Sequence, residues 1–385
     1  MVWPDYDGGS IANLISSIGE ACGAPDLPCV RAILLDPDEI RGATNIVLLV
    51  VDGLGLDYLR RRGKGGALLD HLRGGLTSVF LSTTACAIPT FLTGLPPQQH
   101  GLTGWHMYFD EIDRITAVLP LVPRNGPPFA FAPGELTRRL FPQNSLTKRI
   151  HRPAHILSPA RIANSEFNRF HSLGATRWSY RTRDEFFAQL AQIVDLPEAK
   201  YVHAYYPTLD TLAHDHGVDS PHVAGVFRAF DEAFASFLRQ VRGSGTTVIA
   251  TADHGFIDAP EERLIELDAH PKLESMLLRP LCGERRVAFA YVKPGLHDAF
   301  ADYVNTELAH AATLFRSEDL IAEGRFGPGV PHPKLGSRTG HFTLVMKDDW
   351  TIKQWLPGEQ PYTQIGMHGG TSAAEMWVPL IVANA

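Results

Sequence analysis

The sequence predicts an α/β fold built on a mostly parallel sheet that helices cover. Apolar segments ending in Asp-Gly or Asp-His recur along the 385 residues, and helical patterns separate them. Strands that alternate with helices are typical of parallel sheets with helices packed on their faces. The apolar fraction of 44% is enough for a large core and excludes disorder for most of the chain.

Four segments are expected to form strands of this sheet. Residues 44–51 (TNIVLLVV) are apolar and β-branched, which is typical of a strand buried on both faces. Residues 200–206 and 246–251 are the second and third candidates. Residues 377–383 are the fourth, and there Pro379 favours an edge position or an irregular start.

The clearest helix is expected at about 221–242. Its apolar residues recur at spacings of four and three and so form one face. They are Val223, Phe227, Phe230, Phe234, Phe237 and Val241. Ser220 and Pro221 are a suitable N-cap and first helical residue, and Gly243 is suitable just beyond the end. Another helix, at about 183–194, precedes the second strand.

Two segments, at about 106–175 and 260–345, break the alternation. The first is rich in Pro and Arg and has little periodicity. The second contains an expected strand at 286–292, a helix at about 296–309 and a strand at 312–316. Candidate ligands lie on both sides of each segment. We therefore interpret them as insertions that cap the sheet of one catalytic domain spanning residues 1–385.

The composition also narrows the partners and the environment. A net charge of −7 provides no broad basic field for a nucleic-acid polymer or an anionic membrane. The longest aliphatic run, 46–51, is far shorter than the roughly 20 residues of a membrane span. The first ten residues lack the pattern of a signal peptide, and the four cysteines are expected to be reduced, although Cys22 and Cys29 lie close enough in sequence to pair. These features favour a cytoplasmic protein; the oligomeric state is not indicated.

Six Asp and His side chains follow the predicted strands or precede the last one. They are Asp52, Asp210, His214, Asp253, His254 and His368. Because the carboxyl ends of parallel strands meet at one edge of a sheet, we expect these side chains to converge. Each one alone has a plainer explanation as a turn residue, a surface pair at helical spacing or a loop tip. Together they indicate a metal site.

A seventh candidate lies in residues 82–94 (STTACAIPTFLTG), where small hydroxyl residues precede an apolar helical stretch. The free N–H groups and positive dipole end of such a helix favour a phosphate. Ser82, Thr83 or Thr84 could equally serve only as an N-cap. A threonine hydroxyl is a poor nucleophile unless a metal or a base activates it, and neighbouring ions would provide that activation.

In these motifs the sequence resembles the type I phosphodiesterase/nucleotide pyrophosphatase family of the alkaline phosphatase superfamily. The matching segments span residues 46–382 and thin out in the two insertions. They are IVLLVVDGLG (46–55), STTACAIPTFLTGLPPQQHGLTG (82–104), YYPTLDTLAHDHG (205–217), TADHG (251–255) and MHGG with EMWVPLIV (367–382). The resemblance implies an alkaline-phosphatase-like sheet with helices on both faces and inserted cap elements.

The resemblance also implies two divalent metal ions, usually Zn²⁺, with Mn²⁺ or Fe as alternatives. By motif position, Asp210, His214 and His368 would hold one ion. The other would be held by Asp52, Asp253 and His254 together with Thr84, which stands where the family has its nucleophile. The implied reaction cleaves a phosphodiester or pyrophosphate-type bond of a small molecule through a covalent phosphothreonine.

One departure keeps the substrate class open. Family members usually carry an Asn three residues after the nucleophile, and here that residue is Ala87. A phosphomonoesterase, a phosphonate hydrolase and a catalytically silent metal-binding domain are the alternatives. Candidate substrate contacts, each with core packing or a surface loop as the plainer role, are Thr83, Trp105, Tyr108, Tyr205 and His341.

Overall fold

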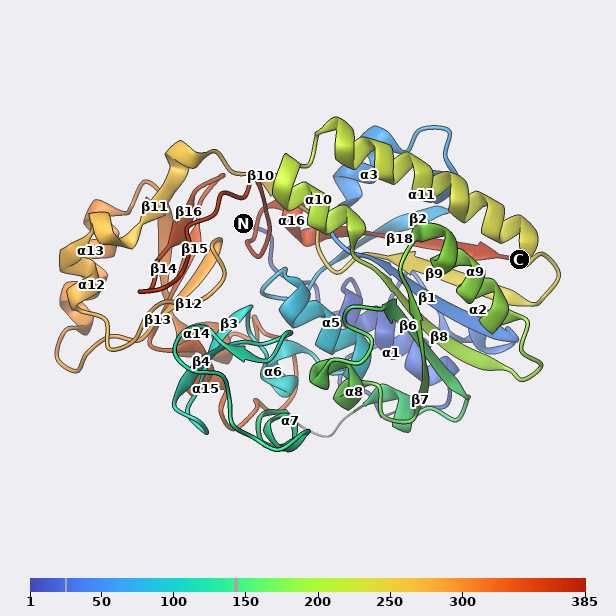
Figure 1. The fold of residues 1–385 in the computed structure, drawn as a ribbon, viewed down its shortest axis with the longest axis horizontal. Helices are drawn as coiled ribbons and strands as arrows, with labels where there is room; N and C mark the ends of the chain where they lie inside the picture. The colour runs from blue at the N-terminus through green and yellow to red at the C-terminus, as the bar shows by residue number, and fades with distance from the viewer. Residues whose placement is uncertain (25, 142–144) are drawn as a thin grey trace.

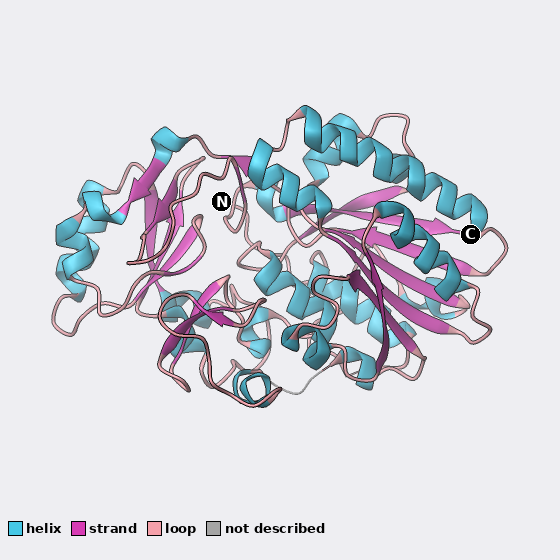
Figure 2. Cartoon of the chain, viewed as in Figure 1, coloured by secondary structure: helices cyan, strands magenta, loops and turns pink. Residues whose placement is uncertain are grey.

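A computed structural model describes residues 1–24, 26–141 and 145–385. Within these ranges the strands form two seven-stranded sheets that lie side by side (Figures 1 and 2). In spatial order, the central sheet contains β2 (Leu72–Thr77), β18 (Trp377–Asn384), β9 (Thr246–Thr251), β1 (Asn45–Val51), β8 (Lys200–Tyr206), β6 (Ala154–Pro159) and β7 (Ala175–Tyr180). The second sheet contains β14 (Ala312–Arg316), β15 (Phe342–Met346), β13 (Val287–Ala290), β12 (Cys282–Gly283), β3 (His106–Phe109), β4 (Arg114–Ala117) and β5 (Val122–Pro123).

The helices and two short strand pairs complete the fold. The pairs are β10 (Ile257–Asp258) with β17 (Gly366–Met367), and β11 (Leu264–Glu266) with β16 (Thr351–Lys353). The helices are α1 (Ile11–Ala21), α2 (Pro37–Arg41), α3 (Leu56–Arg62), α4 (Ala67–Asp70), α5 (Thr84–Thr93), α6 (Pro97–His100), α7 (Glu135–Leu140), α8 (Glu166–His171), α9 (Arg183–Val194), α10 (Thr208–His216), α11 (Pro221–Gln240), α12 (Pro271–Ser275), α13 (His297–Glu307), α14 (Ser317–Ala322), α15 (Leu335–Thr339) and α16 (Ala373–Met376).

The middle of the central sheet confirms the predicted fold class. All seven residues of β1 are buried, and β1 pairs in parallel with β8 on one side and β9 on the other. In this register Val51 lies opposite Tyr206, and Val50 lies opposite Thr251. The three strands therefore end at the same edge, and the residues that follow them emerge there together.

The last strand differs from its prediction. β18 lies inside the sheet, antiparallel to both β2 and β9, although Pro379 favoured an edge position. Pro379 is tolerated because the strand pairs with β2 over Trp377–Ile381 and with β9 only from Ile381 onward. Its missing N–H therefore falls where β18 is paired on one side, next to a register shift.

Helices cover both faces of the central sheet, with α9 and α11 on one face and α1 and α5 on the other (Figure 1). The predicted N-cap of α11 is confirmed, because the Ser220 hydroxyl accepts a hydrogen bond from the Val223 N–H at 3.3 Å. The apolar residues of its predicted face are all buried. The helix ends one residue earlier than its glycine suggested, with Val241 as the C-cap and Gly243 (φ +81°) two positions beyond.

The first segment interpreted as an insertion is only partly one. Residues 154–159 form β6, an interior strand of the central sheet between β8 and β7. His155, Ser158 and Pro159 interrupt its apolar pattern, and this strand is therefore hard to recognise from the sequence. In the second segment the predicted strands and helix are found as β13, α13 and β14.

The two segments join in a single sheet, which the sequence did not predict. β3 from the first segment pairs with β12 from the second, with His106 opposite Gly283. The backbones approach so closely that a Cβ on Gly104 would stand 2.8 Å from the Gly283 Cα. Glycine at both positions therefore permits the junction, and Gly283 also has a positive φ of 87°.

The second sheet has two different apolar faces, as alternation along a strand requires. Val287 and Phe289 of β13 belong to the main core, which includes β1 and α5. Ala288 and Ala290 point to the other side and join a separate core with Phe300 of α13. The second sheet is therefore packed between its own helices and the central body.

All four cysteines are buried and carry free thiols, as predicted. Burial raises the pKa of Cys22 and of Cys29 to about 12, which leaves both thiols protonated near neutral pH. Among the described residues, we find no helix whose length and apolar character would allow it to cross a membrane.

Truncating the apolar face of α11 should destabilise the fold. Phe234 is fully buried, so Phe234→Ala should lower the free energy of unfolding by about 3–5 kcal/mol through lost burial and a residual cavity. The matched control is Arg228→Ala on the exposed side of the same helix, expected to change it by less than about 0.5 kcal/mol. Urea denaturation measures both, and equal effects would contradict the assigned face.

Candidate active site

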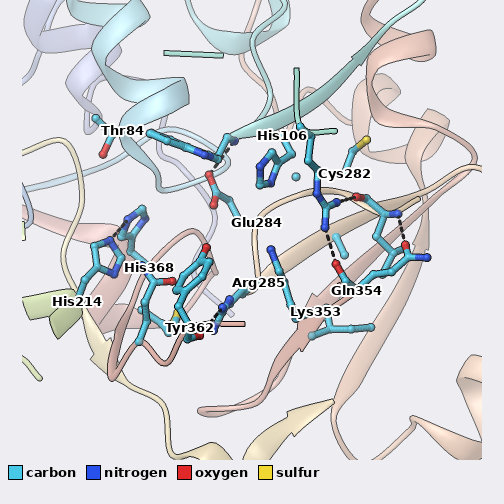
Figure 3. A pocket seen from close by; sticks show the side chains of 18 of the residues that line it. Thr84, His106, His214, Cys282, Glu284, Arg285, Lys353, Gln354, Tyr362 and His368 are labelled. Atoms are coloured by element: carbon cyan, nitrogen blue, oxygen red, sulfur yellow. Dashed lines mark hydrogen bonds between the residues drawn. The ribbon is translucent and has the colours of Figure 1, made fainter. Parts of the chain in front are cut away.

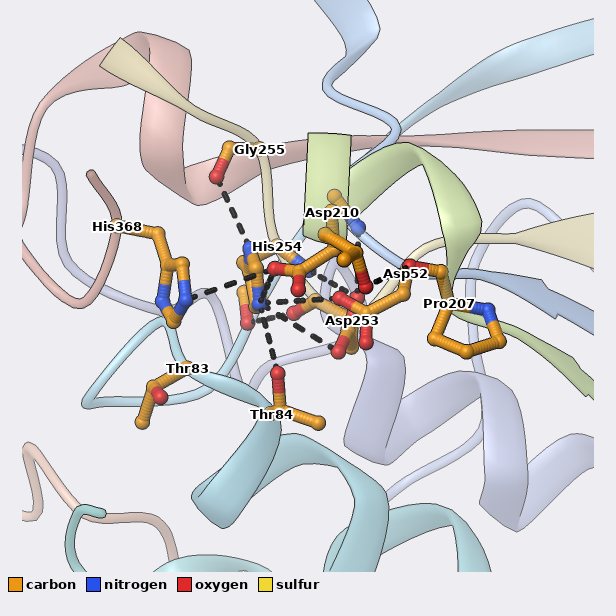
Figure 4. A network of polar contacts seen from close by, with 12 residues as sticks. Asp52, Thr83, Thr84, Pro207, Asp210, Asp253, His254, Gly255 and His368 are labelled. Carbon is orange, nitrogen blue, oxygen red and sulfur yellow. Dashed lines mark hydrogen bonds and ion pairs between the residues drawn. The ribbon is translucent and has the colours of Figure 1, made fainter. Parts of the chain in front are cut away.

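Five of the six predicted ligands converge at the carboxyl edge of the central sheet (Figure 4), and the sixth, His214, lies beside His368. His254, three residues after the end of β9, lies at the centre of the group. Its Nε2 is 3.3 Å from Asp52 Oδ1, 3.5 Å from Asp253 Oδ2 and 4.0 Å from Asp210 Oδ1. One loop thus brings an imidazole and a carboxylate to the carboxylates that follow β1 and begin α10.

The remaining two imidazoles form a second group around Asp210. The Nε2 atoms of His214 and His368 are 3.2 Å apart. Asp210 Oδ1 is 3.5 Å from the first and 3.7 Å from the second. The spacing of four residues on α10 places Asp210 and His214 on the same side of the helix, as predicted. His368 comes from the segment after β17, more than 150 residues later.

The unsatisfied atoms in this cluster fit bound cations. Among the described residues, Asp52 Oδ1, Asp210 Oδ1 and Asp253 Oδ2 are buried and have no hydrogen-bond partner. Buried polar atoms are seldom left unpaired, so three such oxygens within one cluster suit metal coordination. The donor set of carboxylates and imidazoles is the kind that holds Zn²⁺ or Mn²⁺.

Backbone carbonyls orient two of the imidazoles for this role. His214 Nδ1 lies 2.8 Å from the Gly366 carbonyl oxygen, and His254 Nδ1 lies 3.0 Å from that of Gly255. A carbonyl can only accept, so each Nδ1 carries the proton and donates it. Each Nε2 then presents its lone pair to the cluster, the arrangement usual for metal-binding histidines.

Electrostatics inside the cluster also favour a cation. Burial, followed by the charges of Asp210 and Asp253, raises the pKa of Asp52 well above its ordinary value. The Tyr205 hydroxyl, which donates a hydrogen bond to Asp52 Oδ2, opposes this effect. Burial likewise raises the pKa of Asp210 and lowers that of His368. Bound cations would reverse these preferences and hold the carboxylates ionised.

The seventh candidate stands beside this cluster. Thr84 is the first residue of α5, and its Oγ1 lies 3.1 Å from His254 Nε2. None of the three hydroxyl residues acts as a side-chain cap. Thr83 occupies the N-cap position, but its hydroxyl donates to Glu284 Oε1 at 2.7 Å, and Ser82 Oγ donates to the Gly370 carbonyl oxygen. The capping alternative is therefore wrong for this helix.

A buried ion pair positions the segment that carries His368. Arg286, next to β13, and Glu375 of α16 are almost fully buried and pair through two contacts of 3.1 Å. Glu375 also accepts a hydrogen bond from the Gly370 N–H at 2.8 Å. The ion pair thus connects the second sheet to the loop of one candidate ligand.

Two cavities open beside the cluster, and both are lined by Thr84, Trp105 and Asp210. The first, of about 280 Å³, lies toward the second sheet (Figure 3). The second, of about 450 Å³, lies toward β6, β7 and α8 and has mainly apolar walls. A group transferred at Thr84 would therefore have room for a substituent on either side.

The predicted substrate contacts meet different outcomes. Trp105 lines both cavities, and Tyr205 lines the second. Thr83 lines neither cavity; its hydroxyl is held by Glu284. The structure does not bring Tyr108 or His341 to the site.

Tyr108 and His341 instead contact residues of the second sheet and its loops. Tyr108 faces away in β3, where its hydroxyl bonds Asp113 and Arg279 and its ring lies 3.9 Å beneath the Arg279 guanidinium. His341 accepts a hydrogen bond from the Val292 N–H through Nδ1. Both therefore serve the packing of the second sheet.

Several lining residues were not anticipated from the sequence. They are Arg124, Glu284, Arg285, Lys353 and Gln354 in the first cavity and Arg161, Asn168 and Trp178 in the second. Burial raises the pKa of Glu284 to about 7, partly offset by its hydrogen bonds from Thr83 and from the Trp105 N–H. These residues lie in segments that meet only through tertiary pairing, and no local sequence pattern marks them.

Comparison with known proteins identifies the class that this fold and site define. The model of the type I phosphodiesterase / nucleotide pyrophosphatase family matches residues 46–371, and the chain belongs to that family. Membership places it among phosphoesterase hydrolases with an alkaline-phosphatase-like fold, in a family that is metal-dependent.

Individual relatives are distant. An uncharacterised pyrophosphatase/phosphodiesterase of Schizosaccharomyces pombe is 21% identical over 361 residues, 89% of this chain and 71% of that protein. Human ectonucleotide pyrophosphatase/phosphodiesterase family member 5 is 27% identical over 187 residues, 47% of this chain and 36% of that protein.

Solved structures with the same fold have still lower identity. An inactive variant of murine ectonucleotide pyrophosphatase / phosphodiesterase 5 in complex with AMP superposes with a TM-score of 0.62 at 17% identity, covering 87% of each chain. Phosphonoacetate hydrolase from Sinorhizobium meliloti in complex with phosphonoacetate gives 0.65 at 14% identity, covering 87% of this chain and 89% of that one.

Breaking the buried ion pair should be costly. Arg286→Leu leaves the Glu375 carboxylate buried without its cation, so we expect the free energy of unfolding to fall by about 3–5 kcal/mol. Arg316→Leu is the control, because Arg316 pairs with Glu318 only at the exposed surface, where a pair contributes about 0–1 kcal/mol. Equal losses in chemical denaturation would rule out a structural role for the buried pair.

In the metal-free protein, the stability that Glu284 contributes should fall as the pH rises. An acid whose pKa is higher in the folded state contributes stability below its unfolded pKa, and this contribution is lost as the pH rises through the folded value. For Glu284 that window runs from 4.5 to about 7, and Asp52 acts in the same direction. Thermal unfolding of the wild type and of Glu284→Gln in EDTA measures the effect, and the variant should gain on the wild type as the pH rises across this range. Buried histidines such as His106, whose pKa is lowered to about 3, act in the opposite direction but equally in both proteins.

The variant Asp52→Asn tests whether the carboxylate cluster itself destabilises the metal-free protein. In EDTA at pH 8 it should be more stable than the wild type by about 1–3 kcal/mol, because one buried charge is gone. Added zinc should stabilise the wild type more than the variant. Asp57→Asn, at an exposed pair with Arg61, should match the wild type throughout. The assignment of Asp52 as a metal ligand would be contradicted if Asp52→Asn were less stable than the wild type in EDTA and were stabilised by zinc as much as the wild type is.

Proposed function

We propose that this protein is a two-metal phosphoesterase that cleaves phosphodiester or pyrophosphate-type bonds, with Thr84 as its nucleophile. The observation that carries the proposal is the position of Thr84 Oγ1, 3.1 Å from His254 Nε2 and beside carboxylate oxygens without partners. Family membership supports the reaction class, and two groups of ligand atoms, Asp210 with His368 and Asp52 with Asp253, support two ions, with His254 within reach of both.

The residues divide between the two sites as their contacts suggest. Asp210, His214 and His368 would hold one ion, and Asp52, Asp253 and His254 would hold the other, next to Thr84. When bound, such ions lower the pKa of a hydroxyl group and neutralise charge on phosphoryl oxygens. Zn²⁺ suits this donor set best, with Mn²⁺ and Fe as alternatives.

The chain itself positions the reacting groups. The N-terminal end of α5 carries the positive end of the helix dipole and favours a phosphoryl group next to Thr84. Thr84 Oγ1 would form the new bond to phosphorus while the leaving group departs with the electrons of its P–O bond. Water would then cleave the phosphothreonine, which releases the second product and restores the hydroxyl.

The departure at Ala87 bears on specificity. Ala87 is buried in the first turn of α5, its N–H donates to the Thr83 carbonyl oxygen at 2.9 Å, and it lines neither cavity. A phosphate oxygen would thus lack the side-chain donor that the family usually provides there. The second candidate function, phosphonate hydrolysis, is supported by the similarity to phosphonoacetate hydrolase.

The deciding experiment compares substrates with the zinc-loaded protein. We expect faster hydrolysis of bis(p-nitrophenyl) phosphate than of p-nitrophenyl phosphate or phosphonoacetate. A preference for the monoester or the phosphonate would keep the fold and the metals but replace the substrate class. Bound metal without turnover of any of the three would indicate a catalytically silent domain.

Thr84→Ala tests the nucleophile. This variant should keep its zinc by elemental analysis and lose roughly 10³-fold or more of its turnover, because no covalent intermediate can form. Thr84→Ser should retain measurable activity and should yield a phosphoserine after acid quenching and mass spectrometry. Turnover of the alanine variant near the wild-type rate would remove Thr84 from the reaction.

A cytoplasmic location and a small-molecule substrate remain the expectations from the sequence. The size of the two cavities supports a small-molecule substrate, since volumes of about 280 and 450 Å³ suit the substituents of a small molecule.

A further inference from the structure

The first cavity contains a cation that the proposed mechanism does not use. Lys353, the last residue of β16, lines the cavity together with Thr84 and points into it (Figure 3). The residue is only 8% exposed. Among the described residues, the ammonium group has no hydrogen-bond or ion-pair partner, and its neighbours are the rings of Trp355 at 4.7 Å and Tyr362 at 5.7 Å.

Such an ammonium group is costly in a protein that binds nothing there. Buried charges are usually paired, because removal from water is unfavourable unless an opposite charge compensates. Here burial, followed by the charge of Arg124, lowers the pKa of Lys353 to about 8. The group is therefore protonated at neutral pH but close to losing its proton.

Two other charged groups around the cavity, Arg124 and Glu284, are already engaged. Arg124 pairs with Glu359 at 2.8 Å and donates to the carbonyl oxygens of Leu281 and Gln354. Glu284 accepts hydrogen bonds from Thr83 and from the Trp105 N–H, and it makes no ion pair with Lys353. Lys353 is thus not neutralised by the acidic groups that face it.

Two further groups complete the surroundings of the ammonium. Arg285 donates only to the Tyr362 carbonyl oxygen, at 3.3 Å, and lies over the rings of Trp355 and Tyr362. His106 is held neutral, because burial and then the charge of Arg124 lower its pKa to about 3. Lys353 of β16 and Arg285 between β12 and β13 therefore place two cations without a carboxylate partner on the cavity wall that faces Thr84.

The second cavity is chemically different. Its walls include Ile88 and Leu92 of α5 and the ring of Trp178. The two spaces beside Thr84 are therefore suited to unlike substituents. The first places buried cations beside Thr84, whereas in the second the arginines Arg161 and Arg177 are exposed and the buried wall is largely apolar.

We propose that the first cavity binds an anionic group on one substituent of the phosphodiester substrate, through Lys353 and Arg285. This inference rests on the proposed function and narrows it to diesters in which one arm carries a carboxylate or a further phosphate-like group. The uncharged arm then occupies the second cavity. In this assignment Lys353 is a residue that determines specificity and takes no part in bond cleavage.

Three diesters with the same leaving group test this assignment. They are propyl, 2-carboxyethyl and 2-phosphonoethyl p-nitrophenyl phosphate, which differ only in the end of one arm. For the zinc-loaded wild type we expect kcat/KM to be about tenfold higher, or more, for the charged substrates. The stronger of the two preferences distinguishes a carboxylate site from a phosphate site.

Lys353→Met should remove this preference selectively. The variant should lose about tenfold in kcat/KM with the charged diesters and less than about twofold with the propyl ester. Lys353→Arg should retain most of the preference. The control is Lys347→Met, an exposed lysine of the same region, which should match the wild type on all three. Because Lys353→Met removes a buried unpaired charge, the melting temperature of the variant should be equal to or above that of the wild type. A melting temperature in that range shows that the loss of preference does not come from misfolding.

The pH dependence provides a second readout. The preference for the charged arm should be present below about pH 8 and fall as the pH rises through that value, since Lys353 then loses its proton. In Lys353→Arg the decline should disappear. Equal kcat/KM for all three diesters in the wild type, or an equal loss on the propyl ester in Lys353→Met, would overturn the inference while the proposed function stands. No hydrolysis of any diester by the wild type would instead overturn the proposed function, and the inference with it.

Discussion

Three carboxylates share one buried space at the end of the central sheet, and this clustering is the constraint on which the rest of the site depends. Asp52, Asp210 and Asp253 approach the same imidazole, His254, and each has a buried oxygen without a partner. Like charges held together away from water are unfavourable unless a cation compensates them. The arrangement of these carboxylates is therefore suited to binding cations, whose charge would compensate theirs.

The second sheet belongs to this site as much as the central one does. It carries Arg286, whose pairing with Glu375 fixes the loop near His368, and it carries Glu284, which holds Thr83. Together with the neighbouring β16, it also forms the wall of the first cavity. The parallel sheet thus provides the ligands, whereas the inserted elements stabilise one of them and shape the space where a substrate arm would lie.

Local pattern was enough to predict the parallel core, α9, α11 and the convergence of six ligands, because buried strands and their terminal Asp or His residues are adjacent in sequence. It was not enough for β6, whose polar residues disguise an interior strand, nor for β18, where Pro379 is tolerated by one-sided pairing. The pairing of His106 with Gly283 joins segments that are far apart in the chain. For that reason the cavity residues Lys353 and Glu284 could not be predicted, and Tyr108 and His341 were placed wrongly.

Crystals grown with zinc and measured on both sides of the zinc absorption edge would test the metal centre most directly. Two anomalous peaks are expected, one among Asp52, Asp253 and His254 next to Thr84 Oγ1, and one among Asp210, His214 and His368. A single peak, or peaks away from these six side chains, would contradict the two-metal centre on which the proposed reaction depends.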